Sequence, residues 1–312
     1  MRVVFMGTPD FSVGTLKALA EAGHEIVGVF TQPDKPKGRG KALQPTPVKE
    51  AALELNLPVY QPRRIREPEN YEILKELNPE VIVVVAFGQI IPKSILNLAP
   101  YGCINVHASL LPKYRGAAPV QWAVIDGEKE SGVTIMRMNE GLDTGDMISK
   151  VIVPIEKEET GGSLFDKLSE AGAKLLVETL PSLADKTAVF EKQPEESPTP
   201  YAAMNQKNLG NMDWNKSAVE LERLIRGLNP WPSAYTKLSG KTLKIWSADV
   251  FSNRDMAARP GTILQANAKG FLVQTGKGVL SIKELQLEGK KRMDSQAFLR
   301  GYSVATGTVL PN

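Results

Sequence analysis

The first part of the chain alternates short apolar runs with longer segments in which apolar residues recur at helical spacing. An apolar run at 2–6 is followed by a helical pattern over 11–22 and a second apolar run at 25–30, which is the spacing of a parallel crossover unit. The run Glu80–Phe87 is apolar almost throughout, which predicts a strand covered on both faces at the centre of a parallel sheet. The pattern therefore predicts a Rossmann-like α/β domain over residues 1–189.

The pattern changes after residue 189. Residues 190–206 contain three prolines and several acids, a composition that predicts a linker. Residues 207–312 begin with a helical pattern at 217–228 that Pro230 ends, and short strand-like runs separated by Gly and Asn follow. Such short runs at regular spacing predict a small β-barrel domain over 207–312.

The charges are divided unequally between these two parts. Residues 207–312 carry 16 Lys and Arg against 8 Asp and Glu, a net charge of +8, whereas the remaining 206 residues carry 22 against 27, a net charge of −5. A basic module behind a mildly acidic body suggests a polyanionic partner such as a nucleic acid. The alternative is a basic surface that is solvated and binds nothing.

Other bulk properties argue against several classes of protein. Cys103 is the only cysteine and is accompanied by two histidines, His24 and His107, so a disulfide framework is excluded and we expect no metal site. No apolar run approaches the roughly 20 residues of a membrane span. The first seven residues are too short and too soon interrupted for a signal peptide. We therefore expect a cytoplasmic protein, and nothing in the sequence indicates a protein partner.

The segment Gln32–Pro45 differs in composition from its surroundings. It holds three prolines, two glycines and four basic residues but one acid, so it is not expected to pack into a core. Long unstructured loops within compact α/β domains usually have a function. We interpret this one as a mobile basic arm that meets phosphate, and the alternative is a plain solvated connection.

The stretch Cys103–Gly116 carries the strongest candidate chemistry. It begins as a strand, which a proline and a glycine then interrupt. Side chains alternate along a strand, so Asn105, His107 and also Ser109, if the strand extends that far, point to one side. Ligands of open α/β sheets bind outside the carboxyl ends of the strands, so this stretch is predicted to border an active site.

Asp143, in the turn Gly141–Gly145, completes a candidate set with Asn105 and His107. An imidazole transfers protons near neutral pH, an amide donates to an oxyanion, and a carboxylate orients the imidazole or holds a water. Taken singly, Asn105 is better explained as a strand-end hydrogen bonder and Asp143 as a turn residue bound to its own backbone. No nucleophilic cysteine or serine elbow is present, which favours direct acyl transfer over a covalent intermediate.

Several motifs resemble those of a known family. The 10-formyltetrahydrofolate-dependent formyltransferases are matched by Asn105–Pro112, Tyr114–Gly116 and Gly141–Gly145. The branch of that family that formylates initiator methionyl-tRNA is resembled most closely at Met6–Phe11, Gly38–Lys41 and Pro119–Ala123. The resemblance covers essentially the whole chain, including its basic C-terminal part.

The resemblance implies a fold, a co-substrate and roles for individual residues. The family's catalytic residues fall on Asn105, His107 and Asp143, and its co-substrate is 10-formyltetrahydrofolate. The tetrahydrofolate site falls on Ser109, Leu110, Leu111 and Pro112, beside Phe87, Gly88 and Gln89. The family's inserted loop, here 34–49, reaches the acceptor end of initiator methionyl-tRNA; its critical arginine corresponds to Arg39, and the basic residues beside it are Lys37 and Lys41. The C-terminal part corresponds to an OB-fold-like domain that binds tRNA.

Three other functions remain open from the sequence. A related formyltransferase that acts on a sugar nucleotide or a small ribonucleotide amine would share the three polar residues but would not need a basic second domain. A non-catalytic tRNA-binding module is opposed by the intact Asn105, His107 and Asp143. An NAD enzyme is opposed because the turn Gly7–Asp10 after the first strand lacks the pattern G-x-G-x-x-G.

Overall fold

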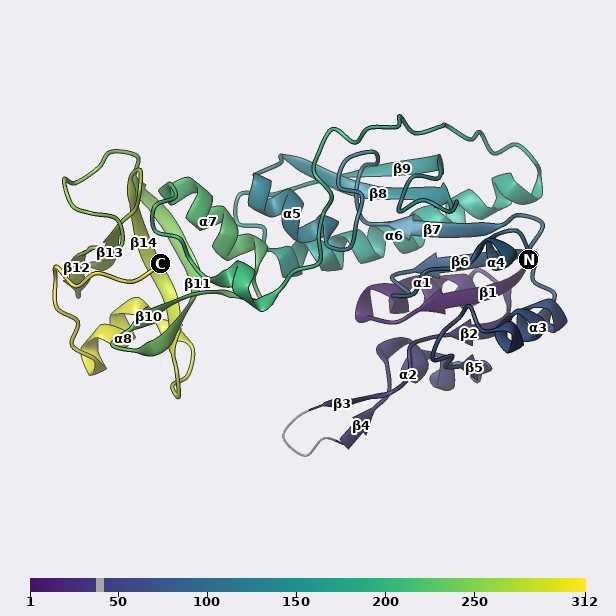
Figure 1. The fold of residues 1–312 in the computed structure, drawn as a ribbon, viewed down its shortest axis with the longest axis horizontal. Coiled ribbons are helices and arrows are strands. Elements are labelled where there is room, and N and C mark those ends of the chain that lie inside the picture. Colours follow the sequence, from purple (N-terminus) through teal and green to yellow (C-terminus); the bar gives the residue numbers. More distant parts are fainter. Residues whose placement is uncertain (38–41) are drawn as a thin grey trace. The chain divides into compact units, whose positions relative to one another are not determined.

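The structure is a computed structural model that describes residues 1–37 and 42–312. The chain divides into two compact units, which can be followed in Figure 1. The first unit comprises residues 1–119, 130–154 and 165–202, and the second comprises 120–129, 155–164 and 203–312. Residues 120–129 and 155–164 thus group with the C-terminal part of the chain, so the division into units is not a single boundary along the sequence.

A seven-stranded sheet forms the centre of the first unit, in the order β5-β2-β1-β6-β7-β8-β9. The strands are β1 (Arg2–Gly7), β2 (Glu25–Phe30), β5 (Val59–Tyr60), β6 (Val81–Val85), β7 (Cys103–His107), β8 (Glu130–Arg137) and β9 (Asp146–Pro154). The pairs from β5 to β7 are parallel, and β8 and β9 continue the sheet antiparallel. The predicted Rossmann-like sheet is confirmed, and it carries an antiparallel edge that the apolar pattern did not indicate.

Helices cover both faces of this sheet. On one face, α3 (Pro68–Leu77) and α4 (Lys93–Leu96) contribute Leu74 and Ile95 to a buried cluster that also contains Cys103. The strands supply branched apolar side chains to this cluster, and β6 is buried at every position, as its continuous apolar run predicts.

The other helices are α1 (Asp10–Glu21), α2 (Pro47–Glu54), which contacts α1, and the long α6 (Gly161–Ala184). The rings of Phe11 and Phe165 meet edge to face with centroids 5.1 Å apart. A β-carbon at Gly172 would lie 2.9 Å from Val106 Cγ1, so the glycine lets α6 approach β7 closely. In the described part of the chain no helix is both long and apolar enough to cross a membrane.

In the segment interpreted as a basic arm, the described residues form two strands, whereas the composition predicts an unstructured loop. Strands β3 (Lys35–Lys37) and β4 (Ala42–Gln44) pair antiparallel. At the foot of this hairpin, Asp34 accepts hydrogen bonds from Lys49 Nζ at 2.7 Å and from Gln61 Nε2 at 2.6 Å. The pairing joins backbone groups of two three-residue strands, and composition does not record such pairing.

The second unit is built on an antiparallel sheet in the order β10-β11-β14-β13-β12, with β15 paired to β14. Its strands are β10 (Ala234–Leu238), β11 (Lys241–Ser252), β12 (Ile263–Asn267), β13 (Gly270–Gln274), β14 (Val279–Leu287) and β15 (Met293–Asp294); its helical segments are α5 (Pro119–Asp126), η1 (Lys207–Gly210), α7 (Ala218–Gly227) and α8 (Ser295–Gly301). Trp214, Leu221 and Phe271 are fully buried in its core. The predicted C-terminal β-domain is thus present as an antiparallel sheet with β10 and β12 at the ends of the strand order.

The segment expected as a linker, 190–206, is divided between the units. Residues up to Ala202 group with the first unit and residues from Ala203 group with the second. Gln193 within it is 6% exposed, and Arg115 donates hydrogen bonds to the carbonyls of Pro194 and Glu195. The first part of this segment is therefore packed against the α/β unit rather than free.

Candidate active site

Strand β7 carries Asn105 and His107 to the carboxyl end of the parallel part of the sheet. Both side chains lie on the face where Cys103 is buried, because side chains alternate along a strand. Asn105 is 9% exposed and His107 is 6% exposed, so both face a protected space. Burial raises the pKa of the Cys103 thiol to about 12, which rules this thiol out as a nucleophile at neutral pH.

The ring of His107 is held between a carbonyl and a carboxylate. Its Nε2 atom lies 3.0 Å from the carbonyl oxygen of Tyr114, and its Nδ1 atom lies 3.7 Å from Oδ1 of Asp143. A carbonyl oxygen only accepts, so Nε2 carries the proton of that hydrogen bond. A separation of 3.7 Å is longer than a hydrogen bond, so Nδ1 lies near the Asp143 carboxylate without being directly bonded to it.

Asp143 is fixed by the backbone around it. It adopts a left-handed conformation with a φ of 55°. Its second carboxylate oxygen, Oδ2, accepts a hydrogen bond of 2.9 Å from the backbone N–H of Gly116. Within the same turn, Asn139 Oδ1 accepts from the N–H of Gly141 and from Thr144 Oγ1, each at 2.9 Å. The carboxylate therefore reaches His107 from a turn with a defined shape.

The amide of Asn105 has no hydrogen-bond partner among the residues that the structure describes, although the side chain is 9% exposed. In the described residues the buried side-chain atoms without a partner are Thr15 Oγ1 and Asn205 Oδ1, so the amide of Asn105 is accessible and not a sealed unpaired group. An amide donor that is left free beside an imidazole and a carboxylate is suited to bind an oxygen that arrives with a substrate. The three residues predicted from the sequence thus lie together at one end of the sheet.

Comparison with known proteins shows the family to which the chain belongs. A family model described as formyl transferase matches residues 1–180, and the model of the formyl transferase C-terminal domain matches residues 205–303. The chain is 61% identical to the methionyl-tRNA formyltransferase of Agathobacter rectalis over 308 residues, which cover 99% of both chains. The chain belongs to the methionyl-tRNA formyltransferase family. It is also 56% identical over 314 residues to the methionyl-tRNA formyltransferase of Lachnospira eligens, again with 99% of both chains covered.

More distant solved structures share the fold. An N-formyltransferase from Helicobacter canadensis, in complex with folinic acid and dTDP-3-aminofucose, superposes with a TM-score of 0.67 at 19% identity, covering 93% of this chain and 99% of that one. HypX from Aquifex aeolicus in complex with tetrahydrofolic acid gives a TM-score of 0.62 at 18% identity, covering 96% of this chain and 47% of that one. At these identities the likeness shows a common fold.

The segment after β6, which the family resemblance places at the folate site, is anchored through its backbone. The carbonyl of Phe87 accepts hydrogen bonds from Thr8 Oγ1 at 2.9 Å and from Gln32 Nε2 at 3.2 Å, and Gln32 also reaches the carbonyl of Gly88. The side-chain amide of Gln89 binds the backbone of the neighbouring loop. Its Oε1 accepts a hydrogen bond from the N–H of Ile65, and its Nε2 donates one to the carbonyl of Pro62. Polar side-chain atoms of this segment are therefore used to hold its shape.

The segment Ser109–Pro112 is also bound within the protein. The hydroxyl of Ser109 donates to the carbonyl of Lys113 at 2.7 Å, and Thr134 on β8 bridges the carbonyl of Ser109 and the N–H of Leu111. Leu110 and Pro112 line a hollow of about 320 Å³ beside Lys113 and Tyr114. The Leu111–Pro112 peptide bond is cis. The loop thus presents apolar side chains and a fixed backbone.

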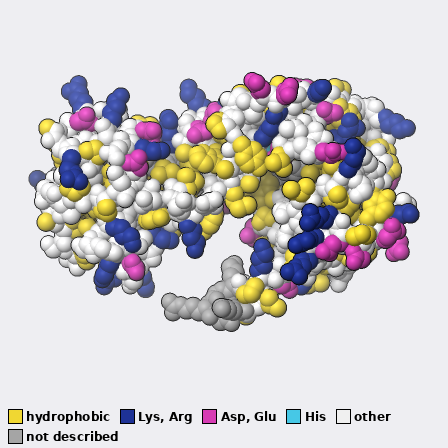
Figure 2. Space-filling view, viewed as in Figure 1, with side chains coloured by type: hydrophobic (Ala, Val, Ile, Leu, Met, Phe, Trp, Pro, Cys, Tyr) yellow, Lys and Arg dark blue, Asp and Glu magenta, His cyan; other side chains and the backbone are white. Residues whose placement is uncertain are grey.

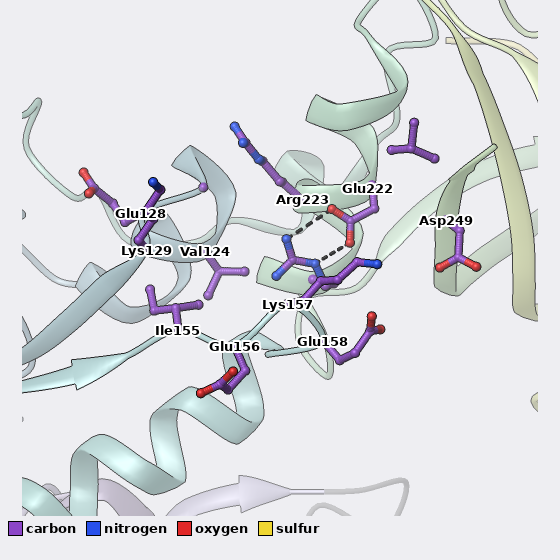
Figure 3. A pocket seen from close by; sticks show the side chains of 13 residues that line it. Val124, Glu128, Lys129, Ile155, Glu156, Lys157, Glu158, Glu222, Arg223 and Asp249 are labelled. Carbon is purple, nitrogen blue, oxygen red and sulfur yellow. Dashed lines mark hydrogen bonds and ion pairs between the residues drawn. The ribbon is translucent and has the colours of Figure 1, made fainter. Parts of the chain in front are cut away.

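Of the basic residues expected to meet tRNA, Arg39 and Lys41 lie outside the described residues, and Lys37 is the last residue of β3. Figure 2 shows Lys and Arg side chains distributed over the visible face of the second unit, as its composition predicts. A hollow of about 550 Å³ in this unit is lined by both charges, including Glu222, Arg223, Lys157 and Asp249 (Figure 3). Glu222 is paired there with Arg226. With acidic and basic side chains side by side, this hollow does not by itself indicate a site for a polyanion.

Sequence reasoning missed the groups that hold the site in place. The carbonyl of Tyr114 and the N–H of Gly116 are backbone groups. The sequence motif that contains them does not indicate that they bind His107 and Asp143. Gln193 donates to the carbonyls of Asp143 and Gly145, although it lies in a stretch whose composition indicated a linker.

Proposed function

We propose that this protein transfers the formyl group of 10-formyltetrahydrofolate to the α-amino group of methionine on initiator methionyl-tRNA. The observation that carries the proposal is the free amide of Asn105 on the same face as His107, whose Nδ1 atom is 3.7 Å from Asp143. The full-length identity to methionyl-tRNA formyltransferases supports the choice of acceptor.

In the proposed reaction the neutral amine attacks the formyl carbon, forming a carbon–nitrogen bond and an oxyanion. The Asn105 amide donates a hydrogen bond to that oxyanion. Because Nε2 of His107 is bonded to the Tyr114 carbonyl, Nδ1 is the ring nitrogen left open toward Asp143 and an incoming substrate. The amide donor acts most strongly in the transition state, when the negative charge develops.

Collapse of the tetrahedral species breaks the bond between the formyl carbon and N10. The attacking nitrogen has become cationic and loses a proton, and N10 gains one, so the products are tetrahydrofolate and the formylated amine. Asp143 is placed to relay this proton through a water, because its Oδ1 lies near His107 but is not directly bonded to it. No covalent enzyme intermediate is needed, which agrees with the inert thiol of Cys103.

The proposed folate contacts are Phe87, Gly88 and Gln89 together with Ser109, Leu110, Leu111 and Pro112. In the structure the polar atoms of Gln89 and Ser109 already bind the protein backbone. These residues would therefore act by shaping an apolar wall with fixed backbone groups, which suits a flat ring with polar edges.

The proposed tRNA contacts are Lys37, Arg39, Lys41 and the basic second unit. Residues 207–312 carry a net charge of +8, which favours a polyanion. The proposal places the protein in the cytoplasm, where initiator tRNA is formylated.

A formylation assay with labelled 10-formyltetrahydrofolate tests the function. Initiator methionyl-tRNA, elongator methionyl-tRNA, free methionine and an amino sugar nucleotide are compared as acceptors. We expect rapid transfer to the initiator tRNA and a steep loss of tRNA use with rising salt, because phosphate contacts release counterions. Equal transfer to free methionine, or preference for the sugar nucleotide, would overturn the proposed acceptor.

A further inference from the structure

Residues 193–202 run beside the loop that follows β7 and are bonded to it repeatedly. Three hydrogen bonds join Ser197 Oγ to the carbonyl of Pro112 at 2.9 Å, Thr199 Oγ1 to the N–H of Tyr114 at 2.7 Å, and the N–H of Ala202 to the carbonyl of Arg115 at 2.8 Å. The Tyr114 that is anchored here is the residue whose carbonyl accepts from His107. This segment therefore supports the catalytic loop and is more than a connection.

Gln193 makes the most central contacts in this segment. Its Nε2 donates to the carbonyl of Asp143 at 2.9 Å and to the carbonyl of Gly145 at 2.7 Å. Its Oε1 accepts from Arg115 Nε at 3.0 Å. Both amide protons and the amide oxygen are thus used, in a side chain that is 6% exposed.

Arg115 determines which way the amide of Gln193 faces. Its guanidinium is 7% exposed and donates to the carbonyls of Pro194 at 2.6 Å and Glu195 at 2.9 Å as well as to Gln193. Within the described residues it has no carboxylate partner. A guanidinium only donates, so the amide must turn its oxygen to Arg115 and its NH2 to the turn that carries Asp143.

Asp143 has a φ of 55°, and the two hydrogen bonds from Gln193 hold the carbonyls of Asp143 and Gly145 within this turn. We propose that Gln193 is a positioning residue for formyl transfer, holding the backbone at Asp143 and Gly145 so that the Asp143 carboxylate stays beside His107. This inference rests on the proposed function of the site. The hydrogen bonds of Gln193 go to two backbone carbonyls and to Arg115, so Gln193 would act through Asp143.

The first test replaces Gln193 by Leu, which keeps the volume and removes the donors, and by Glu, which keeps the shape but turns an acceptor toward two carbonyls. We expect kcat to fall about 100-fold, as a misplaced catalytic group does, with the KM for initiator methionyl-tRNA unchanged. The matched control is Asn70→Ala, since Asn70 is another buried amide that donates to a backbone carbonyl, that of Arg64 at 3.0 Å. It should lower the melting temperature without lowering kcat below that temperature.

The second test combines Gln193→Leu with Asp143→Asn. If Gln193 acts through Asp143, the two losses in kcat are not additive, and Gln193→Leu changes kcat little once Asp143 is already replaced. Fully multiplicative losses would show that Gln193 acts elsewhere and would overturn the inference. If the Leu variant does not fold, Gln193→Glu is used in the same cycle.

The third test does not depend on catalysis. The protein has two histidines, so selective ¹⁵N-histidine labelling gives the ring signals of His24 and His107 alone. We expect the Nδ1 signal of His107 to move in Gln193→Leu and Gln193→Glu while the His24 signals stay, and neither histidine to respond to Asn70→Ala. If the parent protein fails to formylate methionyl-tRNA, the proposed function falls while this measurement still reports on positioning. If the parent is active but the variants keep both kcat and the His107 signals, the positioning role of Gln193 is wrong.

Discussion

The Nδ1 atom of His107 lies 3.7 Å from Oδ1 of Asp143, while the opposite ring nitrogen is bonded to a backbone carbonyl. Nε2 therefore carries a proton, and Nδ1 is left facing the carboxylate across a gap longer than a hydrogen bond. The proposed proton relay would use this gap.

Replacing either member of this pair should slow turnover without weakening tRNA binding. For His107→Asn and Asp143→Asn we expect kcat to fall by about 10²–10⁴, the usual contribution of acid–base catalysis, with the tRNA KM nearly unchanged. Steady-state formylation kinetics measure both constants. His24→Asn is the control, because His24 lies in the turn before β2, where it contacts the N-terminal amine. A rise in KM with kcat preserved would assign His107 to binding instead.

Asn105 should show a loss of activity without a loss of stability. Its amide has no partner in the described part of the chain and is not one of the sealed unpaired atoms there, so Asn105→Leu breaks no hydrogen bond within the protein. We expect kcat to fall by about 10²–10³, as for the loss of one oxyanion donor. Thermal unfolding should show a melting temperature equal to or above that of the parent protein. A large drop in melting temperature would mean that the amide has a structural partner.

Much of this site could be predicted from the sequence because its candidate residues lie in short motifs within one strand and one turn. Alternation along one strand is enough to bring Asn105 and His107 to one face, and a glycine-rich turn after β8 is a natural place for Asp143. The contacts that support the site could not be predicted, because they join segments that are far apart in the sequence. Gln193 meets Asp143 across 50 positions and Arg115 across 78, and nothing in a stretch rich in proline and acids marks a buried amide.

The same distinction explains the differences in fold. The strands were found because apolar runs of four to eight residues are local signals. The antiparallel pairing of β8 and β9 depends on how the chain returns to the sheet, which periodicity does not record. The hairpin of β3 and β4 depends on contacts of Asp34 with Lys49 and Gln61.

Gly116 is a further position where the structure demands one residue type. Its φ is 129°, and an added β-carbon would lie 2.6 Å from the carbonyl oxygen of Ala202. Gly116→Ala should cost about 1–3 kcal/mol for the backbone conformation alone, and it should displace the N–H that binds Asp143, so that kcat falls as well. The control is Gly23→Ala, since Gly23 has a φ of 78° but nothing within 4 Å of its added β-carbon. Urea unfolding and formylation kinetics of both variants should show a stability loss in each and a kcat loss in Gly116→Ala alone.

The foot of the β3–β4 hairpin should respond to acid. The hydrogen bond from Lys49, aided by one from Gln61, lowers the pKa of Asp34 below its ordinary value of 3.8. A carboxyl group with a lowered folded-state pKa stabilises the fold above its unfolded-state pKa, and this contribution is lost as the pH falls through the lower folded-state value. Asp34→Asn should therefore lower the melting temperature at pH 7, and the difference from the parent should close as the pH falls below 3.8. Thermal unfolding across this pH range measures the difference. Asp185→Asn, at an exposed acid beyond the end of α6, should show no such closing difference. A gap between Asp34→Asn and the parent that persists in acid would mean that its cause is the altered shape and not the charge.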